Sequence, residues 1–160
     1  MQLLIAAVGR LKQGPGRDLA AHYAGRIDAT GRGLALGPVE IAELVESRAA
    51  TAELRKADEA TRLGNAVAKA EILIALDETG KPVTSRGFAE MLRKHRDGGC
   101  ARLGFAIGGP DGQGPGIKSR SATVLSLGAM TLPHGLARIV LLEQIYRAVT
   151  LIGGHPYHRD

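Results

Sequence analysis

A chain of 160 residues with 44% hydrophobic side chains is large enough to bury a core without disulfides or a structural metal. Its one cysteine, Cys100, excludes an internal disulfide and a cysteine-built metal site. Aromatic residues make up only 3%, which excludes base stacking on aromatic side chains as the main mode of any nucleic-acid binding. The formal net charge of +5 favours a polyanionic partner.

The sequence carries no pattern typical of export or of a membrane protein. The apolar run from Leu3 to Val8 is too short for a secretion signal and has no basic segment before it. No apolar stretch approaches the roughly 18 residues that a membrane-spanning helix needs. A single thiol fits the reducing conditions of the cytosol. We therefore expect a cytoplasmic protein without membrane association.

Short apolar runs alternate with helical patterns along the chain. Apolar runs bounded by turn residues predict strands at residues 2–8, 38–45, 71–76, 102–107 and 122–125. Helical periodicity predicts helices at residues 17–29, 47–70, 88–96 and 133–152. Ser85 is the expected N-cap of the third helix, and Pro133 is the expected first residue of the fourth. The pattern predicts an α/β fold, with a mainly parallel sheet flanked by helices, in a single domain over residues 1–160.

Three loops that follow predicted strands are candidates for ligand binding. They begin at Leu76, Gly108 and Leu127, and ligands of parallel sheets bind beyond the carboxyl ends of the strands. Chain order alone does not show that the three loops meet. The glycine spacing from Gly108 to Gly116 matches neither the dinucleotide-binding fingerprint nor the phosphate-binding loop, so a plain flexible turn is the alternative there.

The last predicted helix is apolar on most of its circumference and must be covered on several sides. In a small domain a second subunit is the expected cover. We therefore predict a homodimer that buries Ile139, Leu142 and Ile145 or their neighbours. Glu143 and Arg147 lie on the polar stripe of this helix, at the i,i+4 spacing that favours an ion pair.

The segment after the last helix concentrates reactive side chains. His155, Tyr157, His158 and Arg159 supply two imidazoles, a phenol and a guanidinium. A frayed polar terminus and a segment that contacts a ligand are both open interpretations. His155 and His158 could bind a metal ion by their spacing, but Asp160 is the only carboxylate nearby in the sequence and there is no nearby cysteine. Because two histidines and one carboxylate leave the ligand set incomplete, we expect no metal site.

Other polar residues of the last helix also have two interpretations. His134 lies in the first turn, where the helix dipole disfavours the imidazolium, so it is either a neutral hydrogen-bonding residue beside a ligand or a cap. Arg138, Arg147 and Arg159 suit phosphate contacts, which position RNA without reading its sequence. For Arg147 the alternative is its ion pair with Glu143.

Several of these motifs resemble one enzyme family. The sequences TLPH at 131–134, EQIYRA at 143–148 and YHR at 157–159 are similar to those of the large-subunit ribosomal RNA (pseudouridine-N3) methyltransferases, which belong to the SPOUT class of knotted methyltransferases. IGGPDG at 107–112 and LD at 76–77 lie where this family has its other two loops. The resemblance covers the whole chain and implies a SPOUT-type fold with a C-terminal trefoil knot.

The resemblance also implies an activity and a set of site residues. The expected reaction transfers a methyl group from S-adenosylmethionine to N3 of a pseudouridine in 23S ribosomal RNA, in the large subunit or the assembled ribosome. The implied cofactor pocket consists of Leu76, Gly108, Leu127, Gly128, Ala129, Met130, Thr131 and Leu132. The implied catalytic or target-binding residues are Glu143, Arg147, His155, Tyr157, His158 and Arg159.

Two other functions remain open from the residues alone. A ribosome-binding or RNA-binding factor without catalysis would use the basic surface, and a flavodoxin-like protein would bind a nucleotide. The N3 proton acceptor is also open between a tail histidine, Glu143 and solvent.

Overall fold

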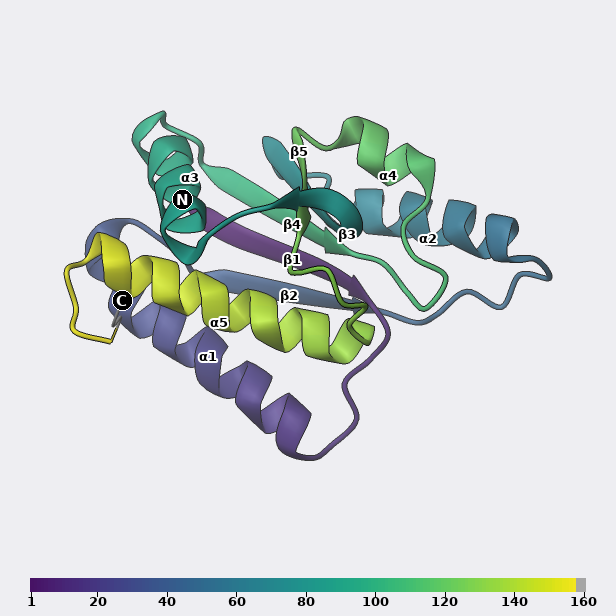
Figure 1. Ribbon diagram of the computed structural model, residues 1–160, viewed down its shortest axis with the longest axis horizontal. Helices are drawn as coiled ribbons and strands as arrows, with labels where there is room; N and C mark the ends of the chain where they lie inside the picture. The colour runs from purple at the N-terminus through teal and green to yellow at the C-terminus, as the bar shows by residue number, and fades with distance from the viewer. Residues whose placement is uncertain (158–160) are drawn as a thin grey trace.

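The computed structural model describes residues 1–157 and has the α/β architecture expected from the sequence (Figure 1). Within that range the strands of its sheet are β1 (Gln2–Val8), β2 (Val39–Leu44), β3 (Ile72–Pro82), β4 (Arg102–Ile107) and β5 (Thr123–Ser126). The helices are α1 (Pro15–Gly31), α2 (Ala52–Ala66), α3 (Ser85–Asp97), α4 (Pro115–Arg120) and α5 (His134–Ile152), with a short 3-10 helix, η1 (Arg32–Leu34).

The sheet has the strand order β2-β1-β4-β3-β5, and every neighbouring pair is parallel. Ile5 of β1 and Ile74 of β3 both align with Phe105 of the central strand β4. Because all strands point the same way, the loops after β3, β4 and β5 leave the sheet at one edge, from three adjacent strands. The prediction of a parallel sheet flanked by helices is confirmed.

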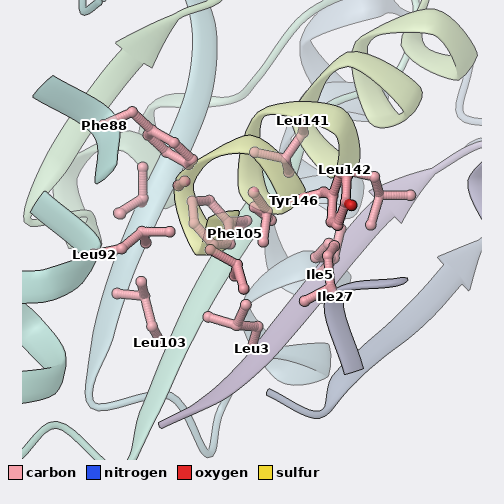
Figure 2. Close-up of a cluster of buried hydrophobic side chains, with 14 of the residues drawn as sticks. Leu3, Ile5, Ile27, Phe88, Leu92, Leu103, Phe105, Leu141, Leu142 and Tyr146 are labelled. Carbon is pink, nitrogen blue, oxygen red and sulfur yellow. The ribbon is translucent and has the colours of Figure 1, made fainter. Parts of the chain in front are cut away.

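Helices cover both faces of the sheet, and side chains of β1 alternate between the two cores. Leu3 and Ile5 belong to the core under α1, α3 and α5, which Figure 2 shows. Leu4, Ala6 and Val8 pack on the other face, against α2 and α4. Burial on both faces explains why this strand is a continuous apolar run in the sequence. Within the described residues, no helix combines the length and the hydropathy needed to cross a bilayer.

Helix α5 lies between α1 and α3, and α1 and α5 run side by side in Figure 1. Leu142 and Ile145 have no exposed surface in this arrangement. The prediction that a second subunit covers these two residues is therefore wrong, because helices and strands of the same protomer bury them. Leu136 is 52% exposed and Ile139 is half-buried, so part of the first two turns lacks such cover.

Some element boundaries differ from the sequence-based expectation. Helix α2 begins after Thr51, whose hydroxyl accepts from the Leu54 N–H, and not at residue 47. The N-cap of α3 is Thr84 and not Ser85, since the Thr84 hydroxyl accepts from the third residue of the helix. Pro133 is the N-cap of α5 and not its first residue.

Two further differences concern the edge of the sheet that holds the loops. Strand β3 continues to Pro82 through a register shift between Leu76 and Lys81, because the segment beyond the polar bulge pairs with β5 again. The apolar run alone predicts a strand that ends at residue 76, because the residues that follow are polar. The short helix α4 was not predicted at all, since its six residues lie within a Gly/Pro-rich stretch.

Candidate functional site

A cavity of about 630 Å³ opens at the carboxyl edge of the sheet, where the irregular middle of β3 meets the loops after β4 and β5. Its lining comes from three segments and from Ala137 of α5. The segments are residues 76–78 in the middle of β3, residues 107–113, and residues 126–134 without 129. The strands β4, β3 and β5 are neighbours, and this adjacency brings together loops that are far apart in the sequence.

The cavity contains most of the residues predicted to bind a cofactor. Seven of the eight line its wall: Leu76, Gly108, Leu127, Gly128, Met130, Thr131 and Leu132. Ala129 does not line the cavity and is exposed. The structure thus joins three segments that chain order alone left unconnected.

The loop after β4 is held by its own packing. A Cβ placed on Gly108 would lie 2.7 Å from Gln113 Cγ and 3.0 Å from the Gly112 carbonyl carbon, so this position has no room for a side chain. The buried Gln113 donates from Nε2 to the Ala106 carbonyl of β4. Arg55 of α2, which does not line the cavity, forms an ion pair with Asp111. These contacts fix the backbone that forms one wall of the cavity.

The lining of the cavity is acidic and apolar. Asp77, Glu78 and Asp111 contribute carboxylates, and none of the lining residues is Lys or Arg. Burial alone would raise the pKa of Asp77, but hydrogen bonds from Lys118 and Thr79 outweigh it and hold the pKa below its ordinary value. The Asp77 carboxylate therefore stays ionised at neutral pH, which suits a ligand that carries a positive charge.

Asp77 and Asp111 lie in predicted loops of the site, but none of the three acidic side chains was among the predicted cofactor-binding residues. Asp77 and Glu78 directly follow the last apolar residue of the predicted third strand, and Asp111 follows the fourth strand after Gly-Gly-Pro. Their positions just beyond strand ends were the available signal.

His134 forms part of the cavity wall, and its side chain is not a helix cap. No side-chain cap hydrogen bond is present at the start of α5. Gly9 has φ of 87°, and a Cβ placed on it would overlap the imidazole of His134. His134 Nε2 is also 3.8 Å from Glu46 Oε1. Of the two interpretations of His134, the position beside the ligand cavity is the one that fits.

Arg138 is only 1% exposed and lies inside the protein, so the prediction that it contacts phosphate is wrong. Its guanidinium pairs with the Glu43 carboxylate and donates to the Gly9 carbonyl. Burial lowers the pKa of Arg138, and the nearby Glu43 charge partly offsets this effect. The residue links the ends of β1 and β2 to α5.

The predicted catalytic residues form a second cluster, further along α5. Arg147 bonds Glu143 with Nη2 at 2.5 Å and Nε at 3.0 Å, which confirms the predicted ion pair. The Tyr157 ring stacks edge-on against Tyr146 with centroids 4.7 Å apart. The Tyr157 hydroxyl lies 3.5 Å from Glu143 Oε1, so this part of the tail packs against the helix.

The rest of the tail is described only in part. His155 is exposed, and its Nδ1 accepts from the Tyr157 N–H at 3.2 Å. The predictions for His158 and Arg159 lie outside the described residues. Among residues 1–157, no group of three or more His, Cys, Asp or Glu side chains is arranged to hold a metal ion.

The two clusters do not meet within one protomer. Ala137 is the α5 residue furthest along the helix that lines the cavity. Glu143 and Arg147 lie about 9 Å and about 15 Å beyond it along the helix axis, at 1.5 Å per residue. Neither these residues nor Tyr157 line the cavity.

Known proteins resemble this chain in sequence over its full length. A protein of Sinorhizobium medicae named ribosomal RNA large subunit methyltransferase H is 50% identical over 159 residues, which cover 99% of both chains. A Brucella anthropi protein of the same name is 47% identical over 160 residues, with complete coverage of both.

Solved structures agree with this fold. A probable methylase family protein from Haemophilus influenzae superposes with a TM-score of 0.55 at 10% identity, covering 99% of this chain and 70% of that one. A probable methyltransferase from Bordetella pertussis gives 0.54 at 13% identity, covering 92% and 95%. At such identities the likeness concerns the fold alone. Residues 1–158 match the family described as predicted SPOUT methyltransferase, and the chain therefore belongs to the SPOUT methyltransferase family.

Proposed function

We propose that this protein uses S-adenosylmethionine to methylate N3 of a pseudouridine in 23S ribosomal RNA of the large subunit. The observation that carries the proposal is its identity of 47 to 50%, over the whole chain, to proteins named ribosomal RNA large subunit methyltransferase H. Membership of the SPOUT methyltransferase family supports the reaction class. The cytoplasmic location and the C-terminal trefoil knot are further parts of this proposal.

The cavity at the sheet edge fits the cofactor. Its volume of about 630 Å³ falls in the range of small-molecule sites. Backbone groups of residues 127–132 and Gly108 would hold the adenine and ribose, with few side chains in the way. Asp77 and Glu78 supply negative charge, and the lining holds no cation that would repel the sulfonium. Bound there, S-adenosylmethionine would supply an electrophilic methyl group for transfer to N3.

The protein's own task is to position the base and take its proton. N3–H is an imide, so its proton must be removed or shared as the new N–C bond forms. Glu143, held in place by Arg147, is one acceptor; His155 or His158 of the tail and solvent are the others. Arg159 would stabilise the imide anion. Alignment of N3 with the methyl group supplies much of the rate.

We further propose that the active unit is a homodimer. Within one protomer Glu143, Arg147 and Tyr157 do not reach the cavity wall, whereas a partner would bring a second copy of these residues to it. Exposed Leu136, half-buried Ile139 and exposed Leu19 of α1 supply apolar surface for the contact. Residues from both copies would then complete each site.

Two measurements test the proposed function. Equilibrium binding of radiolabelled S-adenosylmethionine should be saturable, with one site per protomer. Ribosomes from cells that lack the modification should acquire one methyl group, which mass spectrometry of digested 23S rRNA would locate on N3 of a pseudouridine. A protein that binds ribosomes but not the cofactor would instead be a non-catalytic ribosome-binding factor, and the proposal would fail.

A further inference from the structure

Three exposed cations lie at positions 10 to 17, in the segment that follows Gly9, and Gly9 packs on the cavity-lining His134. Arg10, Lys12 and Arg17 are exposed, and within residues 1–157 their side chains take part in no hydrogen bond or ion pair. We propose that these residues form a phosphate-binding surface, the 10–17 surface, which holds the rRNA backbone while the target base enters the cavity. The inference rests on the proposed function, because it assigns a binding surface to that RNA substrate.

The 10–17 surface follows the first part of α5. Gly9 packs so closely on the His134 ring that no Cβ would fit between them. Further along, a Cβ on Gly16 would lie 3.6 Å from Ile139 Cδ1. The three cations are carried by the segment between and just beyond these two contacts. Since His134 lines the cavity and Ile139 does not, the segment begins beside the cavity wall and then follows α5.

Its backbone is anchored rather than loose. The Gly9 N–H donates to the Leu44 carbonyl at 2.8 Å, and the Leu11 N–H donates to Glu43 Oε1 at 3.0 Å. The Arg138 guanidinium also donates to the Gly9 carbonyl. Charges on an anchored backbone lose less conformational entropy when they bind phosphates.

Four other cations around this edge of the sheet and on α5 are already engaged with carboxylates. These pairs are Arg55 with Asp111, Lys118 with Asp77, Arg138 with Glu43 and Arg147 with Glu143. A cation that must leave a carboxylate to meet a phosphate gains little. The unpaired charges of the 10–17 surface are therefore better suited to the RNA backbone than Arg138 or Arg147, the residues indicated by the sequence.

Charges of opposite sign lie in the cavity wall and in the segment of residues 10–17, and each sign suits a different ligand. In the cavity wall, Asp77 and Asp111 are paired with Lys118 and Arg55, whereas Glu78 has no cation partner within residues 1–157. The unpaired carboxylate attracts a sulfonium and repels phosphates. The segment of residues 10–17 carries three cations, with one carboxylate, Asp18, next to it in the first turn of α1. An anionic backbone would thus be held beside the cavity, while only an uncharged base enters it.

Salt dependence is the direct test. Each phosphate neutralised by a side chain adds about 0.7 to 0.9 to the slope of log affinity against log salt. We would compare the triple variant Arg10→Gln/Lys12→Gln/Arg17→Gln with the wild type, using purified large subunits and assembled ribosomes between about 50 and 200 mM salt. The slope should fall by about 2 to 3, while S-adenosylmethionine affinity, melting temperature and dimer mass stay unchanged.

A matched control removes the same charge elsewhere. Arg32→Gln/Lys69→Gln/Lys94→Gln neutralises three exposed cations at the opposite edge of the sheet. This control should keep the wild-type slope. For methylation, the Arg10/Lys12/Arg17 variant should raise KM for ribosomes and leave kcat at saturation nearly intact, because it changes no residue placed in the cofactor cavity or in the proposed catalytic cluster.

The outcomes separate this inference from the proposed function. A wild-type slope in the Arg10/Lys12/Arg17 variant, or an equal loss in the control, would overturn the 10–17 surface even if the wild type methylates ribosomes. Wild-type protein with no measurable ribosome affinity would overturn it as well. Ribosome binding that depends on these three cations but yields no methylation would support the surface and overturn the enzyme.

Discussion

Arg55 holds Asp111 with two hydrogen bonds, Nε to Oδ2 at 2.6 Å and Nη2 to Oδ1 at 3.1 Å. The pair joins α2 to the loop after β4, whose backbone lines the cavity. Arg55 also donates to the Ala49 carbonyl, so one guanidinium spans two loops and a helix. Arg55 does not line the cavity, so it acts as a clamp: its hydrogen bonds hold the loop that forms the cavity wall.

The first prediction follows from this clamp. Arg55→Ala should loosen the 108–112 loop and weaken S-adenosylmethionine binding, by less than about tenfold because exposed pairs contribute little. Isothermal titration calorimetry would measure the affinity. Arg93→Ala removes a comparable exposed pair, with Glu90 on α3, and should leave cofactor affinity unchanged. An equal loss in both variants would contradict the role of the clamp.

A second prediction concerns Gly9. Gly9→Ala should push the His134 ring from the cavity wall, because no space exists for a Cβ, and should weaken cofactor binding as well as the fold. Gly99→Ala is the matched control, with φ of 83° against 87° and no atom within 4 Å of the added Cβ. Both variants should lose about 1 kcal/mol of stability from backbone strain. Gly9→Ala alone should lose cofactor affinity as well, measured by calorimetry beside thermal melts.

The third prediction is a pH dependence set by Asp77. Its folded-state pKa is depressed by Lys118 and Thr79, so the stabilisation is complete above the unfolded pKa and is lost as pH falls through the folded value. Stability should therefore hold from neutral pH to about 5 and decline below about 4. Asp77→Asn should cost about 1 kcal/mol at pH 7 and flatten this acid limb in urea titrations. An acid limb of unchanged size in that variant would exclude Asp77 as its source.

The fourth prediction distinguishes a buried arginine from an RNA contact. Arg138→Ala should lower the free energy of unfolding by about 3 kcal/mol, because it leaves Glu43 and the Gly9 carbonyl without their partner. Urea denaturation would measure this loss. At a temperature where the variant stays folded, its salt slope for ribosome binding should match the wild type. A reduced salt slope in the folded variant would instead support the phosphate contact that the sequence suggested for Arg138.

The strands and the candidate loops were predictable because their causes are local. A strand such as residues 2–8 is apolar on both of its faces because helices cover both faces of the sheet. The turn residues that follow such a run indicate where the loop begins. Thr51 was missed as a cap because Ser47 and Thr51 both precede helix-forming residues. Only the pairing with Leu54 in the structure decides between them.

The meeting of the loops and the fate of Arg138 depend on contacts between distant residues. Strand order places β5 beside β3 and β4 beside β1, and no periodicity encodes this order. At about 100° per residue, helical spacing places Arg138 on the opposite side of α5 from Arg147, but its partner Glu43 lies on another element, which the helix sequence does not reveal. Leu142 is likewise buried because α5 packs between α1 and α3. The sequence of the helix alone does not reveal this packing.

The last prediction asks which protomer supplies the tail to each site. Two defective variants are mixed: Gly108→Val, whose side chain would meet Gln113 and block the cofactor, and a truncation after Gly154, which removes the tail. Truncation also removes the Tyr157 ring from Tyr146, so we expect a loss of about 1 kcal/mol in stability and intact cofactor binding.

Each variant alone should methylate ribosomes orders of magnitude more slowly than the wild type. If the tail of one protomer serves the cavity of the other, every heterodimer has one complete site, made from the truncated protomer's cavity and the Gly108→Val protomer's tail. Co-expression should then restore about a quarter of the wild-type activity, because half of the dimers are mixed and each has one working site of two. If tail and cavity belong to the same protomer, no heterodimer contains a complete site and the mixture stays inactive. Light scattering and thermal melts on each variant would verify that both fold and dimerise, so that an inactive mixture counts against the composite site and not against assembly.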